Sequence, residues 1–93
     1  MLYVVSYDAA DNVRRRRLAA LLADHGRRVL ESVFECRLQP ADLPDLLRRA
    51  RLCLHPSEDS LRVYPLCRAC AARVQTAGVL RADARPLPDP LIL

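Results

Sequence analysis

The segment that most constrains the fold is residues 2–7, a run of β-branched and aromatic residues near the start of the chain. This composition is typical of a strand, whose successive side chains point to opposite faces. Both faces are apolar here, since Val4 lies on one and Val5 on the other. A strand buried on both faces needs cover on both. Helices can cover one side of a small sheet and a second copy of the chain the other, so we predict a homodimer.

The length supports the same prediction. The chain has 93 residues, which is enough for one domain. Hydrophobic residues make up 52% of it, a modest core with little margin, and small domains often gain stability by oligomerising. We assign residues 1–78 to the domain and 79–93 to a C-terminal tail for dimer docking. The tail is rich in proline and ends in Leu91, Ile92 and Leu93, which suits an added strand at a sheet edge.

Periodicity and turn residues predict the remaining elements. We expect a helix over 13–25 with Asp11 or Asn12 as its N-cap and Gly26 as its end, a strand over 30–38, a helix from Pro40, a strand over 60–66, a helical turn over 67–73 and a strand over 74–77. Taken literally the order is β-α-β-α-β-β, unless 29–31 and 33–38 are separate strands. A ferredoxin-like α+β sandwich fits best, and this ambiguity stays open.

Four consecutive arginines open the first predicted helix: Arg14, Arg15, Arg16 and Arg17. A helix N-terminus carries partial positive charge, so cations there are mildly destabilising. The same place, with exposed amides and arginine forks, makes a strong phosphate site. Helical geometry puts Arg14 nearest the buried stripe and Arg16 furthest from it. We predict nucleic-acid binding that weakens steeply with salt, against the alternative of a solvated charged face.

The composition of the basic residues also bears on nucleic-acid binding. All fifteen basic residues are arginine, and the formal net charge is +4. A GC-rich genome would explain the absence of lysine but not the positions of the arginines. The arginines of the second helix, Arg48, Arg49 and Arg51, are interpreted as a solvated face, with a second DNA contact as the alternative.

Asp8 stands where the first strand gives way to the loop before the arginines. It could pair with an arginine, or it could hold Mg²⁺ (magnesium), which accepts one or two carboxylates and keeps several waters. A two-fold axis near the strand end would bring two copies of Asp8 together. A general base for catalysis is harder to find, because His25 lies at the far end of the helix and Glu31 or Glu35 must come from the second strand.

Other features exclude several classes of protein. The N-terminus lacks the long apolar region of an export signal, and no apolar stretch reaches membrane-spanning length, so we expect a cytoplasmic protein without a membrane partner. Its four cysteines should then stay reduced. Cys67 and Cys70 have metal-ligand spacing, but no second such pair exists, so a structural zinc site is disfavoured.

Several segments together resemble one known family. They are residues 2–8, the arginines 14–17, the stretch 25–36 with its His-Gly start and Phe-Glu-Cys end, and the stretch 59–67, Asp-Ser-Leu-Arg-Val-Tyr-Pro-Leu-Cys. In order and spacing they are similar to the small CRISPR-associated nucleases, the "Cas-two" family. The likeness covers nearly the whole chain. Each motif alone is weak, whereas the combination is specific.

The resemblance implies a ferredoxin-like β-α-β-β-α-β fold, with a strand break near residues 31–33 or in the loop before them. It also implies a homodimer in which each C-terminal segment adds a strand to the partner's sheet. Asp8 would be the catalytic residue and Mg²⁺ ligand of a metal-dependent endonuclease. The dimer would bridge CRISPR integrase subunits and hold the duplex DNA that is inserted as a spacer, with nuclease activity on RNA or DNA weak. A stand-alone toxin-type endoribonuclease of the same fold is the alternative.

Overall fold

The apolar strand at the start of the chain becomes the centre of the structure. In the computed structural model, which describes residues 1–78, β1 (Leu2–Asp8) has an antiparallel neighbour on each side in a four-stranded sheet of order β2-β3-β1-β4. Val5 of β1 pairs with Phe34 on one side and Val63 on the other. This central position pairs β1 along both edges, while Tyr3, Val5 and Tyr7 on one of its faces belong to the core and Val4 lies on the other face.

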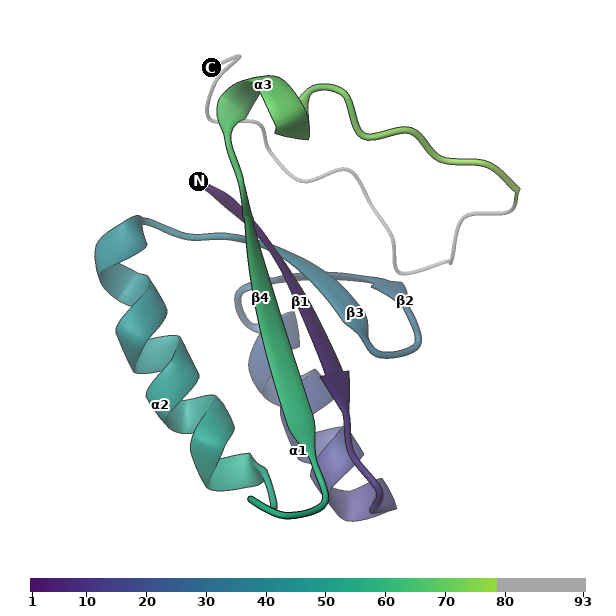
Figure 1. Ribbon diagram of the computed structural model, residues 1–93, viewed down its shortest axis with the longest axis vertical. Coiled ribbons are helices and arrows are strands. Elements are labelled where there is room, and N and C mark those ends of the chain that lie inside the picture. Colours follow the sequence, from purple (N-terminus) through teal and green to yellow (C-terminus); the bar gives the residue numbers. More distant parts are fainter. Residues whose placement is uncertain (79–93) are drawn as a thin grey trace.

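The chain order is β-α-β-β-α-β followed by a short helix (Figure 1). After β1 come α1 (Asn12–Ala23), β2 (Gly26–Leu30), β3 (Val33–Arg37), the 3-10 turn η1 (Pro40–Asp42), α2 (Leu43–Cys53), β4 (Ser60–Leu66) and α3 (Arg68–Ala71). Strand β3 lies between β1 and β2, which is the split β-α-β arrangement of the ferredoxin-like sandwich. The predicted fold class is confirmed.

The predicted single strand over 30–38 is wrong. A turn at Glu31 and Ser32 divides that region into β2 and β3, which pair antiparallel with Leu30 opposite Val33. Side-chain alternation runs through this turn without a visible break, and its one usual turn residue is Ser32, a weaker signal than Gly, Pro, Asn or Asp. The alternative of two separate strands is the correct one, as the family resemblance implied.

Gly26 also differs from its predicted role. Helix α1 ends at Ala23, and Gly26 is instead the first residue of β2, opposite Cys36. A Cβ at this position would lie 2.7 Å from the Cα of Cys36 and closer still to the backbone oxygen of Glu35. Gly26 therefore permits a close approach of two strands, and the helix ends three residues before it.

The core lies between one face of the sheet and the two longer helices, which both cover that face (Figure 1). Leu18 and Leu22 of α1 are fully buried against the sheet, and Leu46 and Ala50 of α2 complete the layer. Phe34 fills the centre of the core. Removing such side chains from water is the main stabilising contribution to a domain of this size.

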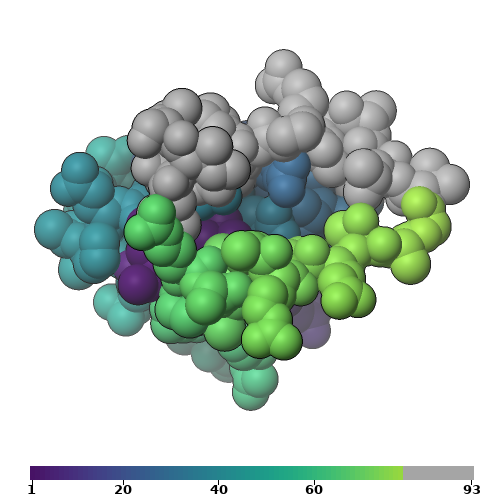
Figure 2. All heavy atoms as spheres, turned by 90° about the horizontal axis from the view of Figure 1, so that it is seen from above, coloured from purple at the N-terminus to yellow at the C-terminus, as the bar shows by residue number. Residues whose placement is uncertain are grey.

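The C-terminal part departs from prediction in one place. The predicted helical turn is confirmed as α3, but residues 74–77 form no strand, and β4 is the last strand of the sheet within residues 1–78. Figure 2 looks onto the end of the molecule where α3 and residues 72–78 lie at the surface. The predicted docking tail, 79–93, lies outside the described residues. Among the helices of residues 1–78, none combines the length and apolarity that crossing a membrane requires.

Candidate nucleic-acid and metal site

Asp8 lies at the rim of a cleft of about 570 Å³ where β1 ends and α1 begins. Its side chain is exposed. The charged and amide groups lining the cleft are Asp8, Asn12, Arg15, Arg16, Arg28 and Glu31. The structure thus brings Asp8 together with the middle two of the four predicted arginines. It also adds Arg28 and Glu31 from β2 and the turn that follows it.

The start of α1 faces this cleft with its positive end. Asp11 is the N-cap, as predicted, and its Oδ2 accepts a hydrogen bond of 3.0 Å from the backbone N–H of Arg14. No acidic residue occupies the first turn of the helix. The carboxylate of the Asp11 cap offsets part of the positive charge at this helix end, but the first turn of α1 adds no acid that would pair with the arginines.

Arg14 turns away from the cleft and toward the loop before β4. Its Nε donates to Oδ2 of Asp59 at 2.6 Å, and its Nη2 lies 3.3 Å from both Asp59 Oδ1 and Glu58 Oε2. The hydrogen bond to Asp59 raises the pKa of Arg14 and lowers the pKa of Asp59. Arg14 is the most buried of the four arginines, as helical geometry predicts, and two carboxylates already occupy its guanidinium.

The other three arginines are exposed, but they differ in their contacts. Arg15 donates from Nη1 to the backbone oxygen of Ala9 at 2.7 Å and from Nη2 to the side-chain oxygen of Asn12. Within residues 1–78, neither the Arg16 nor the Arg17 side chain makes a hydrogen bond or ion pair. Arg16 lines the cleft and Arg17 does not. Among the four arginines, Arg16 is thus the one that lines the Asp8 cleft without a hydrogen bond or ion pair to the described residues.

Arg28 is a cleft residue that sequence reasoning missed. Its guanidinium carbon lies 5.3 Å from the ring centre of Phe34, a cation–π geometry, and its Nε is buried without a hydrogen bond. The register pairs Arg28 directly with Phe34 across the hairpin, so both point to the helix-covered face. Only the division of β2 from β3 reveals this, and the side-chain pattern by itself did not show that division.

The carboxylates considered as general bases separate in the structure. Glu31 lines the cleft, whereas Glu35 points to the opposite face of the sheet, where its Oε1 accepts a hydrogen bond of 2.9 Å from Arg27. His25 follows the last turn of α1, at the end of the helix remote from Asp8, as expected. Glu31 is therefore the base candidate that the fold places near Asp8.

The donor set near Asp8 suits only a loosely held metal ion. Within residues 1–78, no three His, Cys, Asp or Glu side chains converge into a cage. Mg²⁺ does not require one, because it commonly keeps several waters and binds through one or two carboxylates. The exposed carboxylate of Asp8 fits a hydrated ion of this kind. Cys67 and Cys70, by contrast, are exposed at α3, at the opposite end of the sheet from Asp8 (Figure 1).

Comparisons with known proteins agree with this fold. Residues 1–74 match the family model described as CRISPR associated protein Cas2. The chain is 47% identical over 95% of its length to a CRISPR-associated endonuclease Cas2 of Thermus thermophilus, and covers 88% of that protein. It is 46% identical over 98% of its length to a CRISPR-associated endoribonuclease Cas2 of Synechocystis, and covers 97% of it.

Solved structures give the same result. The crystal structure of Streptococcus pyogenes Cas2 superposes with a TM-score of 0.77 and 36% identity, covering 84% of this chain and 100% of that one. A crystal structure of a hypothetical protein from Thermus thermophilus gives the same TM-score at 45% identity, covering 95% of this chain and 96% of that one. Together with the family match over residues 1–74, this shows that the chain belongs to the CRISPR-associated Cas2 family.

Proposed function

We propose that this protein is a dimeric nucleic-acid-binding subunit of the CRISPR spacer-acquisition machinery, which bridges integrase subunits and holds the incoming duplex DNA. The observation that carries the proposal is the arrangement at the start of α1. The Arg16 and Arg17 side chains have no intramolecular partner in the described chain, and they stand at a helix N-terminus with no acid in its first turn. Phosphate oxygens are the ligands that complement such a group of donors.

Binding of this kind is independent of base sequence. Arginine–phosphate contacts position a duplex but carry no base information, so the site holds DNA of any sequence. Each phosphate that is neutralised releases counterions, which makes the affinity fall steeply with salt. These properties suit a subunit that must accept a different DNA segment at each acquisition event.

The homodimer is supported by the sheet face that the helices leave uncovered. The register places Val4 of β1 opposite Tyr64 of β4 on this face. Tyr64 is 45% exposed and lies beside the apolar side chains of Leu2 and Leu66. Leu2 is already buried, so a second copy of the chain would cover mainly Tyr64, Val4 and Leu66, with residues 79–93 extending the contact. The mass of the purified protein in solution, measured by light scattering, tests this part of the proposal.

We further propose a weak Mg²⁺-dependent hydrolysis of phosphodiesters in RNA or DNA, because relatives are named as endonucleases and endoribonucleases. Asp8 would hold the ion, which supplies charge neutralisation and an acidified water at the scissile phosphate. Arg16, which also lines the cleft, binds a phosphate oxygen. Glu31 accepts the proton of the attacking water. Arg15 keeps the loop in place through its bond to Ala9.

The experiment measures cleavage of RNA and duplex DNA with and without Mg²⁺ by the wild type and by Asp8→Asn. The matched control is Asp24→Asn, an exposed carboxylate at the other end of α1. We expect cleavage by the wild type and the control and none by Asp8→Asn. Equal cleavage by all three proteins would remove Asp8 from the chemistry and leave a DNA-holding scaffold.

A pull-down with the CRISPR integrase separates this function from a toxin-type endoribonuclease of the same fold. The proposed subunit is retained by the integrase and binds duplex DNA. Cleavage of RNA alone, by a protein that the integrase does not retain, would contradict the proposal in favour of the toxin.

A further inference from the structure

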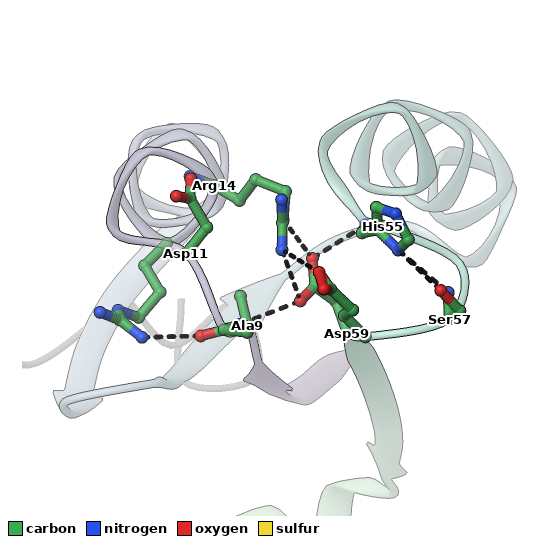
Figure 3. A network of polar contacts seen from close by, with 9 residues as sticks. Ala9, Asp11, Arg14, His55, Ser57 and Asp59 are labelled. Carbon is green, nitrogen blue, oxygen red and sulfur yellow. Dashed lines mark hydrogen bonds and ion pairs between the residues drawn. The ribbon is translucent and has the colours of Figure 1, made fainter.

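Asp59 is the most heavily bonded side chain near the cleft, although it lies outside it. None of its side chain is exposed, and its two carboxylate oxygens accept four hydrogen bonds (Figure 3). The donors are Arg14 Nε at 2.6 Å, Arg14 Nη2 at 3.3 Å, the backbone N–H of Ala10 at 3.0 Å and the backbone N–H of His55 at 2.8 Å. One carboxylate thus joins the β1–α1 loop, helix α1 and the α2–β4 loop.

We propose that Asp59 is a positioning residue of the Asp8 cleft. In this proposal Arg14 binds Asp59 and does not bind a phosphate of the nucleic acid. This inference rests on the proposed function of the cleft. Asp59 holds the loop immediately after Asp8 and thereby sets where the Asp8 carboxylate stands relative to Arg16. It also makes Arg14 different from the arginines that follow it, because a guanidinium bound to Asp59 is not available to bind nucleic acid.

The contacts of the loop itself support this role. Residues 9–11 join β1 to α1. Ala9 is buried in the core, and hydrogen bonds of side chains hold the connection at three points: the Ala9 oxygen by Arg15, the Ala10 N–H by Asp59, and the Asp11 cap on α1. Two of these points are made by residues of α1 or of the loop itself, so they move with the helix. The bond from Ala10 to Asp59 ties the loop to a distant part of the chain.

Glu58 is the natural control for Asp59, because it contacts the same guanidinium but does not hold the loop after Asp8. It contacts the same guanidinium at 3.3 Å, but its side chain is 53% exposed and, within residues 1–78, forms no hydrogen bond to the loop after Asp8. Exposed ion pairs contribute little, whereas removing one partner of a buried, hydrogen-bonded pair leaves the other without compensation. Substitution of the neighbouring carboxylates should therefore have very different effects on the cleft.

The experiment compares Asp59→Asn, Arg14→Gln and the control Glu58→Gln with the wild type. Steady-state cleavage gives kcat and KM, and a Mg²⁺ titration followed at the backbone amide of Asp8 by NMR gives the apparent metal affinity. For Asp59→Asn we expect kcat and metal affinity to fall by about 10-fold to 100-fold, the range found when groups that orient metal ligands are removed. KM and the salt dependence of duplex binding should stay unchanged, since Arg16 and Arg17 are intact.

Arg14→Gln removes the charged partner of Asp59 but keeps its bonds to Ala10 and His55, so kcat and metal affinity should fall as in Asp59→Asn but by less. Glu58→Gln should follow the wild type. Hydrogen exchange at the Ala10 amide should accelerate in Asp59→Asn, which reports the loss of the tether without reference to activity. An Arg14→Gln variant with a shallower salt dependence would overturn the inference, because Arg14 would then be a phosphate contact. Unchanged metal affinity in both variants would overturn it as well.

The outcomes also separate this inference from the proposed function. A wild type that neither binds duplex DNA nor shows a Mg²⁺-induced shift at Asp8 would overturn both. A wild type that does both, with an Asp59→Asn variant indistinguishable from it, would overturn the inference alone. Arg14→Gln keeps the two backbone bonds of Asp59, so it decides the matter even if Asp59→Asn fails to fold.

Discussion

The two long helices both carry clustered arginines, but the carboxylates that pair with these arginines come from different parts of the chain. On α2, Asp45 accepts a hydrogen bond of 2.7 Å from Arg48 and lies 3.1 Å from Arg49, one helical turn away. The bond from Arg48 lowers the pKa of Asp45. On α1 the first turn contains no acid, and the carboxylates that meet Arg14 come from residues 58 and 59.

The position of the acids therefore decides what an arginine cluster can do. Two of the arginines on α2 pair within their own helix, and Arg51 lies in its last turn, where the helix end favours a cation. This agrees with the interpretation of a solvated face. The arginines at the start of α1 stand where the helix end disfavours them, and only a partner from outside the helix can compensate. Arg14 has such a partner in Asp59, whereas Arg16 has no hydrogen bond or ion pair within the described residues.

The largest loss of folding stability should come from substitution in the core beneath the two helices. Phe34 is 2% exposed and lies under Arg28 at the cleft wall, whereas Leu52 on α2 is 79% exposed. Phe34→Ala should lower the free energy of unfolding by about 3–5 kcal/mol, the usual cost of emptying an aromatic core site. Leu52→Ala should leave it unchanged. Urea denaturation measures both, and equal losses would show that the core does not concentrate beneath the cleft.

The next effect tests the arginines themselves. Arg16→Gln with Arg17→Gln should make the slope of log affinity for duplex DNA against log salt less negative by about 0.9 for each phosphate that is no longer neutralised. Arg48→Gln with Arg49→Gln removes the same charge and should leave the slope unchanged. Fluorescence anisotropy at several salt concentrations measures it. A similar change from both pairs would mean that net charge, and not position, governs binding.

A third effect concerns acid stability. The pKa of Asp59 is depressed in the folded protein, chiefly by Arg14 and then by the backbone N–H groups of His55 and Ala10. The stabilisation is therefore fully present above the unfolded pKa of about 3.9 and is lost as the pH falls below it toward the folded value. Between these values the unfolded chain binds more protons. Asp59→Asn should flatten the decline in stability below about pH 4, measured by thermal denaturation.

The pKa of Asp45 is depressed too, but its side chain is 54% exposed. Asp45→Asn should accordingly change the acid limb of stability much less than Asp59→Asn does. If the two variants had the same acid profile, the distinction between a buried tether and a surface pair would fail.

The smallest effect is expected for a substitution on α2, and it concerns the affinity for duplex DNA. Asp45→Asn releases Arg48 and Arg49 without adding an arginine. We expect a slight rise in duplex affinity at low salt that disappears at physiological salt, because exposed charges are then largely screened. Anisotropy at two salt concentrations measures it. A rise that persists at physiological salt would indicate that α2 carries a second DNA site.

Local features of the fold were predictable from the sequence. The run around Val5 predicts the central strand, and Asp11 is recognisable as an N-cap from its type and place. Arg14 is nearest the core because of helical geometry alone. The hairpin at residues 31 and 32 was not recognised from the pattern, because alternation continues through it. The strand predicted over 74–77 was wrong, although its residues have fair strand propensity.

The sequence was sufficient for whatever depends on neighbours along the chain: strand and helix character, the cap, and the accumulation of charge at the start of α1. The three-dimensional fold decided which arginine keeps its charge available. Asp59 lies 45 residues from Arg14 along the chain, and no sequence pattern indicates that their side chains are in contact. Arg28 likewise reaches the cleft only because the hairpin folds it over Phe34. Charge acts through space, so its role is settled only when the fold has brought distant groups together.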